Sequence, residues 1–385
     1  MRFLKWVLII SIFICLGIEI FIWVTGKTYL NILLPKTILS GKLGPDIDEL
    51  SDFKTNTITN EVPQTWTHAA DFINKNIANT TLQKMEDYQT AAFLVIKEDS
   101  ILYERYWDNY DTTSQTNSFS MSKSIVSILI GCAITDGLIK NVDEPVCNYL
   151  EDFESSDLKK ITIRHLLTMS SGLGFKEDYS SMFSWPAEAY YGQDVNKLTI
   201  EQAKPITKPG VIWKYKGGDT QLLGMILKKV TQTSVSEYAS ERLWKPIGAE
   251  YPAYWSLDEN GMEKVSCCWY ATAHDFARIA KLILNYGRWN EKIILDSSYI
   301  VEAIKPAELV TEDGVITRQY GFQWWLMQYN NSPVYYARGI KGQYIFAIPE
   351  KNMIVVRLGH KRAKTEGGSL PADIFLYLDA AFSLL

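Results

Sequence analysis

The segment Ser118–Gly131 (SFSMSKSIVSILIG) carries one charge, Lys123, at the start of a run of apolar and small side chains. A helix formed by these residues is apolar on every side, and such a helix must lie inside the core of a sizeable domain. Ser120 and Lys123 are three residues apart and therefore share one face of the helix. A lysine here either extends its amine to water or loses its proton easily. The segment thus predicts a buried helix with a Ser–Lys pair at its beginning.

The surroundings distinguish this pair from others with the same spacing. Ser51–Lys54, Thr81–Lys84 and Ser156–Lys159 lie in polar, charged stretches, where both side chains are expected in solvent. Ser120–Lys123 alone opens a buried helix, so it is the candidate for chemistry.

The N-terminal segment predicts a membrane helix. Arg2 and Lys5 precede Trp6–Val24, which carries one charge, Glu19, and is long enough to cross a bilayer of about 30 Å. The positive flank places the N-terminus in the cytoplasm and the rest outside. A cleaved signal peptide, with Val24-Thr25-Gly26 as its processing site, is the alternative. Both interpretations predict an extracytoplasmic body, which contacts the membrane, if at all, through residues 6–24.

Three regions follow along the chain. Residues 1–27 are the membrane anchor or signal segment, and residues 28–66 are expected to be a tether because residues 36–66 are polar with Gly, Pro and Asp. Residues 67–385 form the folded domain. In it, residues 91–106 read as a hairpin, the buried helix ends at Asp136-Gly137, and residues 271–287 form an amphipathic helix. Strands near both ends with helices between them predict an α+β fold.

Composition excludes several classes of function. The net charge of −5 does not indicate the positively charged surface that nucleic-acid binding needs. The four histidines show no H-x-x-x-H spacing and the cysteines no C-x-x-C spacing, so neither a metal site nor a cofactor is expected. The five cysteines do not resemble a disulfide framework: a bridge between the adjacent Cys267 and Cys268 needs strained geometry, and a pairing of Cys147 stays open. His165 and His274 are expected to be structural, and Asp219 to cap a helix.

Six motifs in order carry a family resemblance. They are SMSK, ITIRHLLTMSSGL, KPGVIWKYKGGDTQLLG, ATAHDFARIAKLILNYGRW, YGFQWWL and GIKGQYIFAIPEKNMIVVRLG. Together they resemble the serine β-lactamase and penicillin-binding-protein-like (DD-peptidase) hydrolases over about residues 85–383. The resemblance is strongest to the esterase and amidase branch that includes 6-aminohexanoate-dimer hydrolase. It implies an antiparallel sheet flanked by helices, with a mostly helical subdomain.

The resemblance also implies roles for individual residues. Ser120 matches the nucleophile, Lys123 the base, and Tyr215 the tyrosine that shares the proton relay. The N–H groups of Ser120 and Ile340 match the oxyanion donors. The local physics agrees for Ser120, because a serine at a helix start has its own N–H free and lies at the positive end of the helix dipole.

Two departures from the family pattern concern substrate binding. Gly217 stands where the family usually has a small amide or hydroxyl residue. The family's third catalytic motif, called the third motif below, is Lys-Thr/Ser-Gly on a strand, and its hydroxyl binds the carboxylate of a β-lactam. Its equivalent in the last of the six stretches is Gly339-Ile340-Lys341-Gly342-Gln343, which lacks that hydroxyl, so Lys341 is the one substrate-binding cation expected there. The aromatic stretch 174–192, with Tyr179 and Trp185, either walls the cleft and contacts substrate or packs as a closed loop.

These observations predict a serine hydrolase that cleaves a small-molecule or peptide-like ester or amide through an acyl-enzyme. The alternatives are a β-lactamase or DD-peptidase, and a receptor of the same fold that is acylated without turnover. An inactive scaffold is disfavoured because Ser120, Lys123 and Tyr215 are all present. The natural substrate and the oligomeric state stay open.

Overall fold

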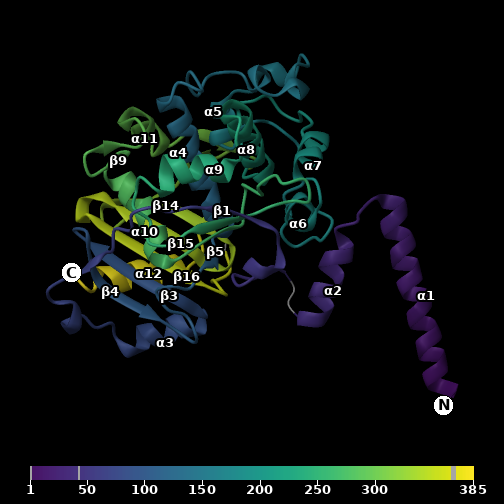
Figure 1. Cartoon of the computed structure of the whole chain (residues 1–385), viewed down its shortest axis with the longest axis horizontal. Coiled ribbons are helices and arrows are strands. Elements are labelled where there is room, and N and C mark those ends of the chain that lie inside the picture. The colour runs from purple at the N-terminus through teal and green to yellow at the C-terminus, as the bar shows by residue number, and fades with distance from the viewer. Residues whose placement is uncertain (1, 42–43, 366–369) are drawn as a thin grey trace.

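A seven-stranded sheet forms the centre of the molecule in the computed structural model, which describes residues 2–41, 44–365 and 370–385 (Figure 1). Neighbouring strands in this sheet pair antiparallel, except that β2 runs parallel to β4 at one edge. In spatial order the strands are β13 (Trp325–Tyr329), β14 (Ser332–Gly339), β15 (Gln343–Ile348), β16 (Met353–Gly359), β3 (Thr90–Lys97), β4 (Ser100–Tyr106) and β2 (Thr67–His68).

The β3–β4 hairpin shows why the sheet is buried on both faces. Its turn residues Glu98 and Asp99 have positive φ, as a tight hairpin needs. Along β3, successive side chains point to opposite faces. Leu94 belongs to the core cluster under the helical half, whereas Phe93 and Val95 belong to the cluster under the C-terminal helix. The expected hairpin at residues 91–106 is therefore confirmed.

Helices cover both faces of the sheet and form a mostly helical half above it (Figure 1). The helix α4 is buried along nearly its whole length and packs against α8, as its all-apolar surface predicts. The expected α+β, β-lactamase-like fold is confirmed. The helices of the body are α3 (Asn79–Asp87), α4 (Ser122–Thr135), α5 (Ile163–Leu167), α6 (Trp185–Tyr191), α7 (Val195–Gln202), α8 (Gly217–Thr231), α9 (Val235–Ala239), α10 (Ala273–Leu284), α11 (Ser297–Ala303) and α12 (Asp373–Phe382).

Smaller sheets join the helical half to the rest. One has the order β1-β7-β8-β5, one β12-β11-β6, and one pairs β10 with β9. Their strands are β1 (Thr55–Ile58), β5 (Thr116–Asn117), β6 (Ile212–Trp213), β7 (Ala253–Ser256), β8 (Trp269–Ala271), β9 (Arg288–Trp289), β10 (Lys292–Ile293), β11 (Leu309–Thr311) and β12 (Ile316–Thr317).

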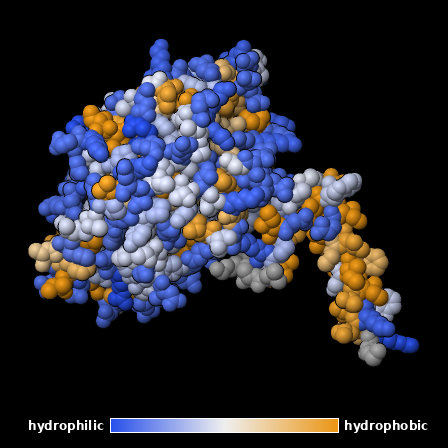
Figure 2. All heavy atoms as spheres, viewed as in Figure 1, coloured by the Kyte–Doolittle hydropathy of each residue, from blue (hydrophilic) through white to orange (hydrophobic). Residues whose placement is uncertain are grey.

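The N-terminal helix α1 (Arg2–Thr25) projects away from the body, and α2 (Leu30–Ser40) lies between them (Figure 1). The surface of α1 is hydrophobic along most of its length (Figure 2). By length and composition α1 can cross a membrane, whereas a signal sequence would pass the same test.

The segment expected to be a tether instead contacts the body. Tyr29, Leu30 and Leu33 are buried at the start of α2, Ile47 is fully buried, and β1 pairs with β7 in register. The reason is that these apolar side chains all join one buried cluster, which also contains Phe119 and Tyr190 of the body. Their partners lie far away in the sequence, so the polar composition of residues 36–66 did not indicate these contacts.

The structure also corrects the expectation for two adjacent cysteines. Cys267 and Cys268 are bonded to each other by a disulfide. Cys132 is free and buried inside α4, as expected for a small core residue, and Cys147 is free.

Candidate active site

Ser120 and Lys123 lie at the start of the buried helix, within hydrogen-bond distance of each other. Ser120 belongs to a 3₁₀ helix (Phe119–Met121) that leads directly into α4. The Lys123 Nζ donates to Ser120 Oγ over 3.0 Å and to the Ser266 carbonyl oxygen over 2.5 Å. Lys123 is 3% exposed, so packing holds its amine against the serine hydroxyl. This is the geometry that a general base and its nucleophile require.

The backbone before Ser120 is held in an unusual conformation. Phe119 has φ of 45°, a left-handed value that few bulky residues adopt. Its N–H donates to the Asn117 side chain over 2.9 Å, and the Ser118 N–H donates to the Trp269 carbonyl oxygen over 2.8 Å. These hydrogen bonds to β5 and β8 stabilise the turn that presents Ser120.

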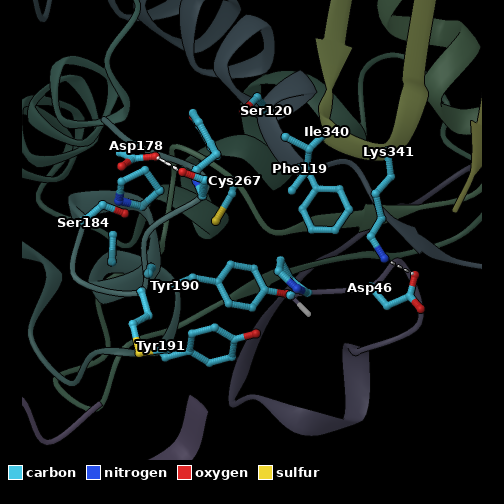
Figure 3. Close-up of a pocket in the computed structure, with 18 of the residues that line it drawn as sticks. Asp46, Phe119, Ser120, Asp178, Ser184, Tyr190, Tyr191, Cys267, Ile340 and Lys341 are labelled. Carbon is cyan, nitrogen blue, oxygen red and sulfur yellow. Dashed lines mark hydrogen bonds and ion pairs between the residues drawn. The ribbon is translucent and has the colours of Figure 1, made fainter. Parts of the chain in front are cut away.

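The third motif forms a turn at the end of β14, directly against the nucleophile. A Cβ on Gly339 would lie 2.3 Å from the Ser118 carbonyl oxygen, so only glycine allows this approach. Ile340 follows and lines the same cavity as Ser120 (Figure 3). The structure thus brings both residues of the predicted oxyanion hole together, and their roles stay predictions.

Lys341 lines the same cavity, but its charge is already paired. Its ammonium lies 3.1 Å from Asp46 Oδ1, a contact drawn in Figure 3. Asp46 also accepts a hydrogen bond from His360 Nδ1 over 2.7 Å and is 4% exposed. Asp46 comes from the segment expected to be a tether, so nothing in the sequence pattern indicated this pair.

Tyr215 lies beside Lys123 and belongs to the stretch KPGVIWKYKGGDTQLLG. The Lys123 Nζ is 5.3 Å from the centre of the Tyr215 ring, and the ring packs against Tyr320 and Trp325. The predicted catalytic residues are therefore neighbours. The role of Tyr215 in the proton relay stays a prediction.

Gly217 and Trp185 explain one departure from the family pattern. A Cβ on Gly217 would lie 2.3 Å from the Trp185 indole, which is 2% exposed and lines the cavity. The indole therefore occupies the space of the missing amide or hydroxyl side chain. Among the described residues, Gly217 is not one that lines the cavity, so its predicted contact with substrate is not supported, whereas Trp185, Tyr179 and Lys341 do line it.

Glu177 is a site residue that the sequence reasoning missed. The Tyr179 hydroxyl donates to Glu177 Oε1 over 2.7 Å and also interacts with Ser120. Burial raises the pKa of Glu177, and the charge of Lys123 opposes that rise. Burial and the Glu177 carboxylate raise the pKa of Tyr179 well above its usual value, so the phenol keeps its proton at neutral pH. The acidic side chain lies in an aromatic loop with no motif around it, so no sequence signal identified it.

Asp219 does not cap its helix as expected. It is the third residue of α8, is fully buried, and accepts a hydrogen bond from Ser171 Oγ over 2.6 Å. Burial raises its pKa to about 6, although Lys216 acts in the opposite direction. The histidines are structural as expected: His274 bonds to Glu104 over 2.9 Å, and His165 completes the capping box of α5.

A cavity of about 1030 Å³ surrounds the nucleophile, and most of its lining surface is apolar. Figure 3 shows Ser120 at one side, with Tyr190, Tyr191 and Cys267 around the space below it. Its size is at the upper end for ligand-binding cavities. Among the described residues no group of three or more His, Cys, Asp or Glu side chains is arranged to hold a metal ion.

A buried helix headed by a serine–lysine pair, beside the end of a strand of the central sheet, defines the class of β-lactamase-fold hydrolases. The chain belongs to the Beta-lactamase family, whose model matches residues 77–378. The 6-aminohexanoate-dimer hydrolase of Paenarthrobacter ureafaciens is 24% identical over 299 residues, which cover 72% of this chain and 74% of that enzyme.

Solved structures show the same fold. A protein from Bacillus anthracis, assigned provisionally as a 6-aminohexanoate-dimer hydrolase, matches with a TM-score of 0.74 at 24% identity, covering 86% of this chain and 91% of its own. A family VIII carboxylesterase matches with a TM-score of 0.64 at 16% identity, covering 84% of this chain and all of its own. The expected relationship to the esterase and amidase branch is confirmed.

Proposed function

We propose that this chain hydrolyses an ester or amide through an acyl-enzyme on Ser120, and that its body lies outside the cytoplasm. The observation that carries the proposal is the 3.0 Å contact between Ser120 Oγ and Lys123 Nζ at the wall of a largely apolar cavity. The names of the related amide and ester hydrolases support the same reaction class.

The reaction proceeds in two halves. Lys123, as the free amine, takes the proton of Ser120 as the hydroxyl oxygen attacks the carbonyl carbon of the substrate. The N–H groups of Ser120 and Ile340 hold the negative oxygen that forms. Lys123 returns the proton to the leaving alcohol or amine, with Tyr215 beside it as the relay. Water then attacks the acyl carbon and gives a proton to Lys123. The bond from the acyl carbon to Ser120 Oγ breaks, Oγ takes the proton back from Lys123, and the carboxylic acid leaves.

The test uses the full chain in detergent with short-chain p-nitrophenyl esters and a serine-directed phosphonate. Ser120→Ala is expected to abolish both turnover and covalent labelling, measured by absorbance and intact mass. Ser156→Ala is the matched control, because Ser156 has the same spacing to a lysine but is exposed. Labelling of Ser120→Ala at the wild-type rate would remove Ser120 from the mechanism.

The role of Lys123 is tested separately. Lys123→Ala is expected to lower kcat/KM roughly 10²–10⁴-fold, the usual contribution of a general base. A stoichiometric burst without further turnover in the wild type would instead favour the acylated receptor. An unchanged rate in Lys123→Ala would contradict its role as the base.

A further inference from the structure

The N-terminal segment forms part of the wall of the catalytic cavity. Leu33 and Thr37 of α2 line the cavity together with Ser120 and Lys123, and so does Asp46. Leu33 and Thr37 are four residues apart, so they present one face of α2 to the cavity. Leu33 is 8% exposed and belongs to an apolar cluster with Phe119, Tyr190 and Tyr191. The segment that joins α1 to the body is thus structurally part of the site.

Several contacts fasten this segment to the aromatic loop on the neighbouring wall. The Tyr29 hydroxyl donates to the Met182 carbonyl oxygen over 2.9 Å, and Lys27 pairs with Glu188 at 3.6 Å. The last turns of α1 take part as well, since the Phe21 ring lies edge-on to Phe183 at 6.2 Å. The apolar α1 therefore ends beside the loop that lines the cavity.

The chemistry of this end of the cavity favours an apolar ligand group. Leu33, Met182 and Trp185 line it, and the ammonium of Lys341 is paired with Asp46 rather than presented to a ligand carboxylate. Met182 is about two-fifths exposed, and so is its neighbour Phe183, which does not line the cavity and lies beside the end of α1. An apolar path thus runs from Ser120, past α2, towards the helix that can cross a membrane.

We propose that the substrate is an amphiphile, an ester or amide whose extended alkyl chain lies against Leu33 and Met182 while its carbonyl reaches Ser120. This inference rests on the proposed function and adds the substrate class. Each methylene that leaves water for such a surface contributes a factor of about four to binding. A cavity of 1030 Å³ is large enough for such a chain.

The experiment measures the ratio of kcat/KM for p-nitrophenyl octanoate to that for the acetate, with the full chain in detergent. The ratio is independent of the amount of active protein, so partial misfolding of a variant does not alter it. The wild-type ratio is expected to exceed about ten, well within the gain that six methylenes allow. Leu33→Asp places a charge in the alkyl path and is expected to lower the ratio at least about tenfold. Met182→Asp, at a partly exposed position, is expected to act in the same direction.

Ile38→Asp is the matched control, because Ile38 lies on the same helix, is 76% exposed and does not line the cavity. It is expected to keep the wild-type ratio within about twofold. A wild-type preference for acetate, or ratios unchanged in both Leu33→Asp and Met182→Asp, would overturn the amphiphile inference while leaving the ester hydrolase intact. Absence of Ser120-dependent turnover of every ester would instead overturn the proposed function and this inference with it.

Discussion

At the scale of single residues, the pairing of Lys341 decides which ligands suit the site. A β-lactam antibiotic presents a carboxylate that needs a cation and a hydroxyl on the third-motif strand. This chain lacks the hydroxyl, and Asp46 lies 3.1 Å from the Lys341 ammonium. A hydrogen bond to a charged group contributes about 1.5–3 kcal/mol, so its loss costs roughly ten- to a hundredfold in affinity. A neutral ester or amide has no such requirement.

The first prediction follows from this pair. The wild type is expected to cleave a short-chain p-nitrophenyl ester with a kcat/KM at least about tenfold above that for a chromogenic cephalosporin. Asp46→Asn releases the Lys341 ammonium and is expected to lower the ester-to-cephalosporin ratio of kcat/KM about threefold or more. Asp48→Asn is the matched control, because Asp48 is half exposed, bonds to Tyr110 and lies 3.9 Å from His360, and does not pair with Lys341. Equal or faster cleavage of the cephalosporin by the wild type would contradict the assignment to esters and amides.

At the scale of elements, a charged cluster ties α10 to β4. His274, at the start of α10, lies 2.9 Å from Glu104 of β4 and 3.5 Å from Glu250. Burial acts to lower the pKa of His274, but its interactions with the two carboxylates outweigh burial and raise the pKa to about 9. Burial likewise acts to raise the pKa of Glu104, and hydrogen bonds from His274 and His68 lower it to about 2. The imidazolium therefore links a helix to the central sheet.

The second prediction concerns the pH dependence of stability. The pKa of His274 is higher in the folded protein than its ordinary 6.5, so its contribution is complete below pH 6.5 and is lost as the pH rises through 9. A difference of that size corresponds to about 3 kcal/mol. His274→Gln is expected to lower Tm at pH 6 and to reduce the further fall in Tm between pH 6.5 and 9.5.

The control for this prediction is His68→Gln. His68 bonds to the same carboxylate over 2.9 Å, but half of its side chain is exposed, so little change in Tm is expected. A Tm of His274→Gln that matches the wild type at both pH values would show that the cluster does not contribute to stability.

At the scale of the whole molecule, the position of α1 relates the catalytic cavity to a membrane. The apolar helix ends beside the loop 178–184, and α2 continues from it into the cavity wall. An uncleaved α1 would therefore hold the mouth of the cavity close to the bilayer surface. Removal of α1 by a signal peptidase would leave α2 in place but would release the body from the membrane.

The third prediction tests these two arrangements. The full chain expressed in cells is expected to sediment with membranes, to resist extraction by high salt and to require detergent for release, because an apolar helix of this length is stable only in lipid or detergent. N-terminal sequencing of the purified protein is expected to begin at Met1 or Arg2. A mature sequence that begins after Gly26 would show that residues 1–26 are a cleaved signal.

The local sequence pattern was sufficient to predict much of the fold and the contact between Ser120 and Lys123. The apolar run after Lys123 predicts α4, because a helix without a polar face has nowhere to lie but the core. The spacing of Ser120 and Lys123 predicts their contact, because positions three apart lie on one side of a helix. The hairpin at residues 91–106 follows from two apolar runs on either side of Lys97-Glu98-Asp99, and the amphipathic α10 follows from apolar side chains that recur with the helical period of 3.6.

Only the tertiary structure decided the rest of the site. Asp46 and Lys341 are 295 residues apart, and the two segments meet because α2 and the turn after β14 pack around the same cavity. Trp185 fills the space above Gly217, and Asp219 is buried rather than capping α8. Residue spacing determines neighbours within one helix or hairpin, where backbone geometry sets the distances. Contacts between separate elements depend on how their shapes pack together, and no periodicity within either segment records that packing.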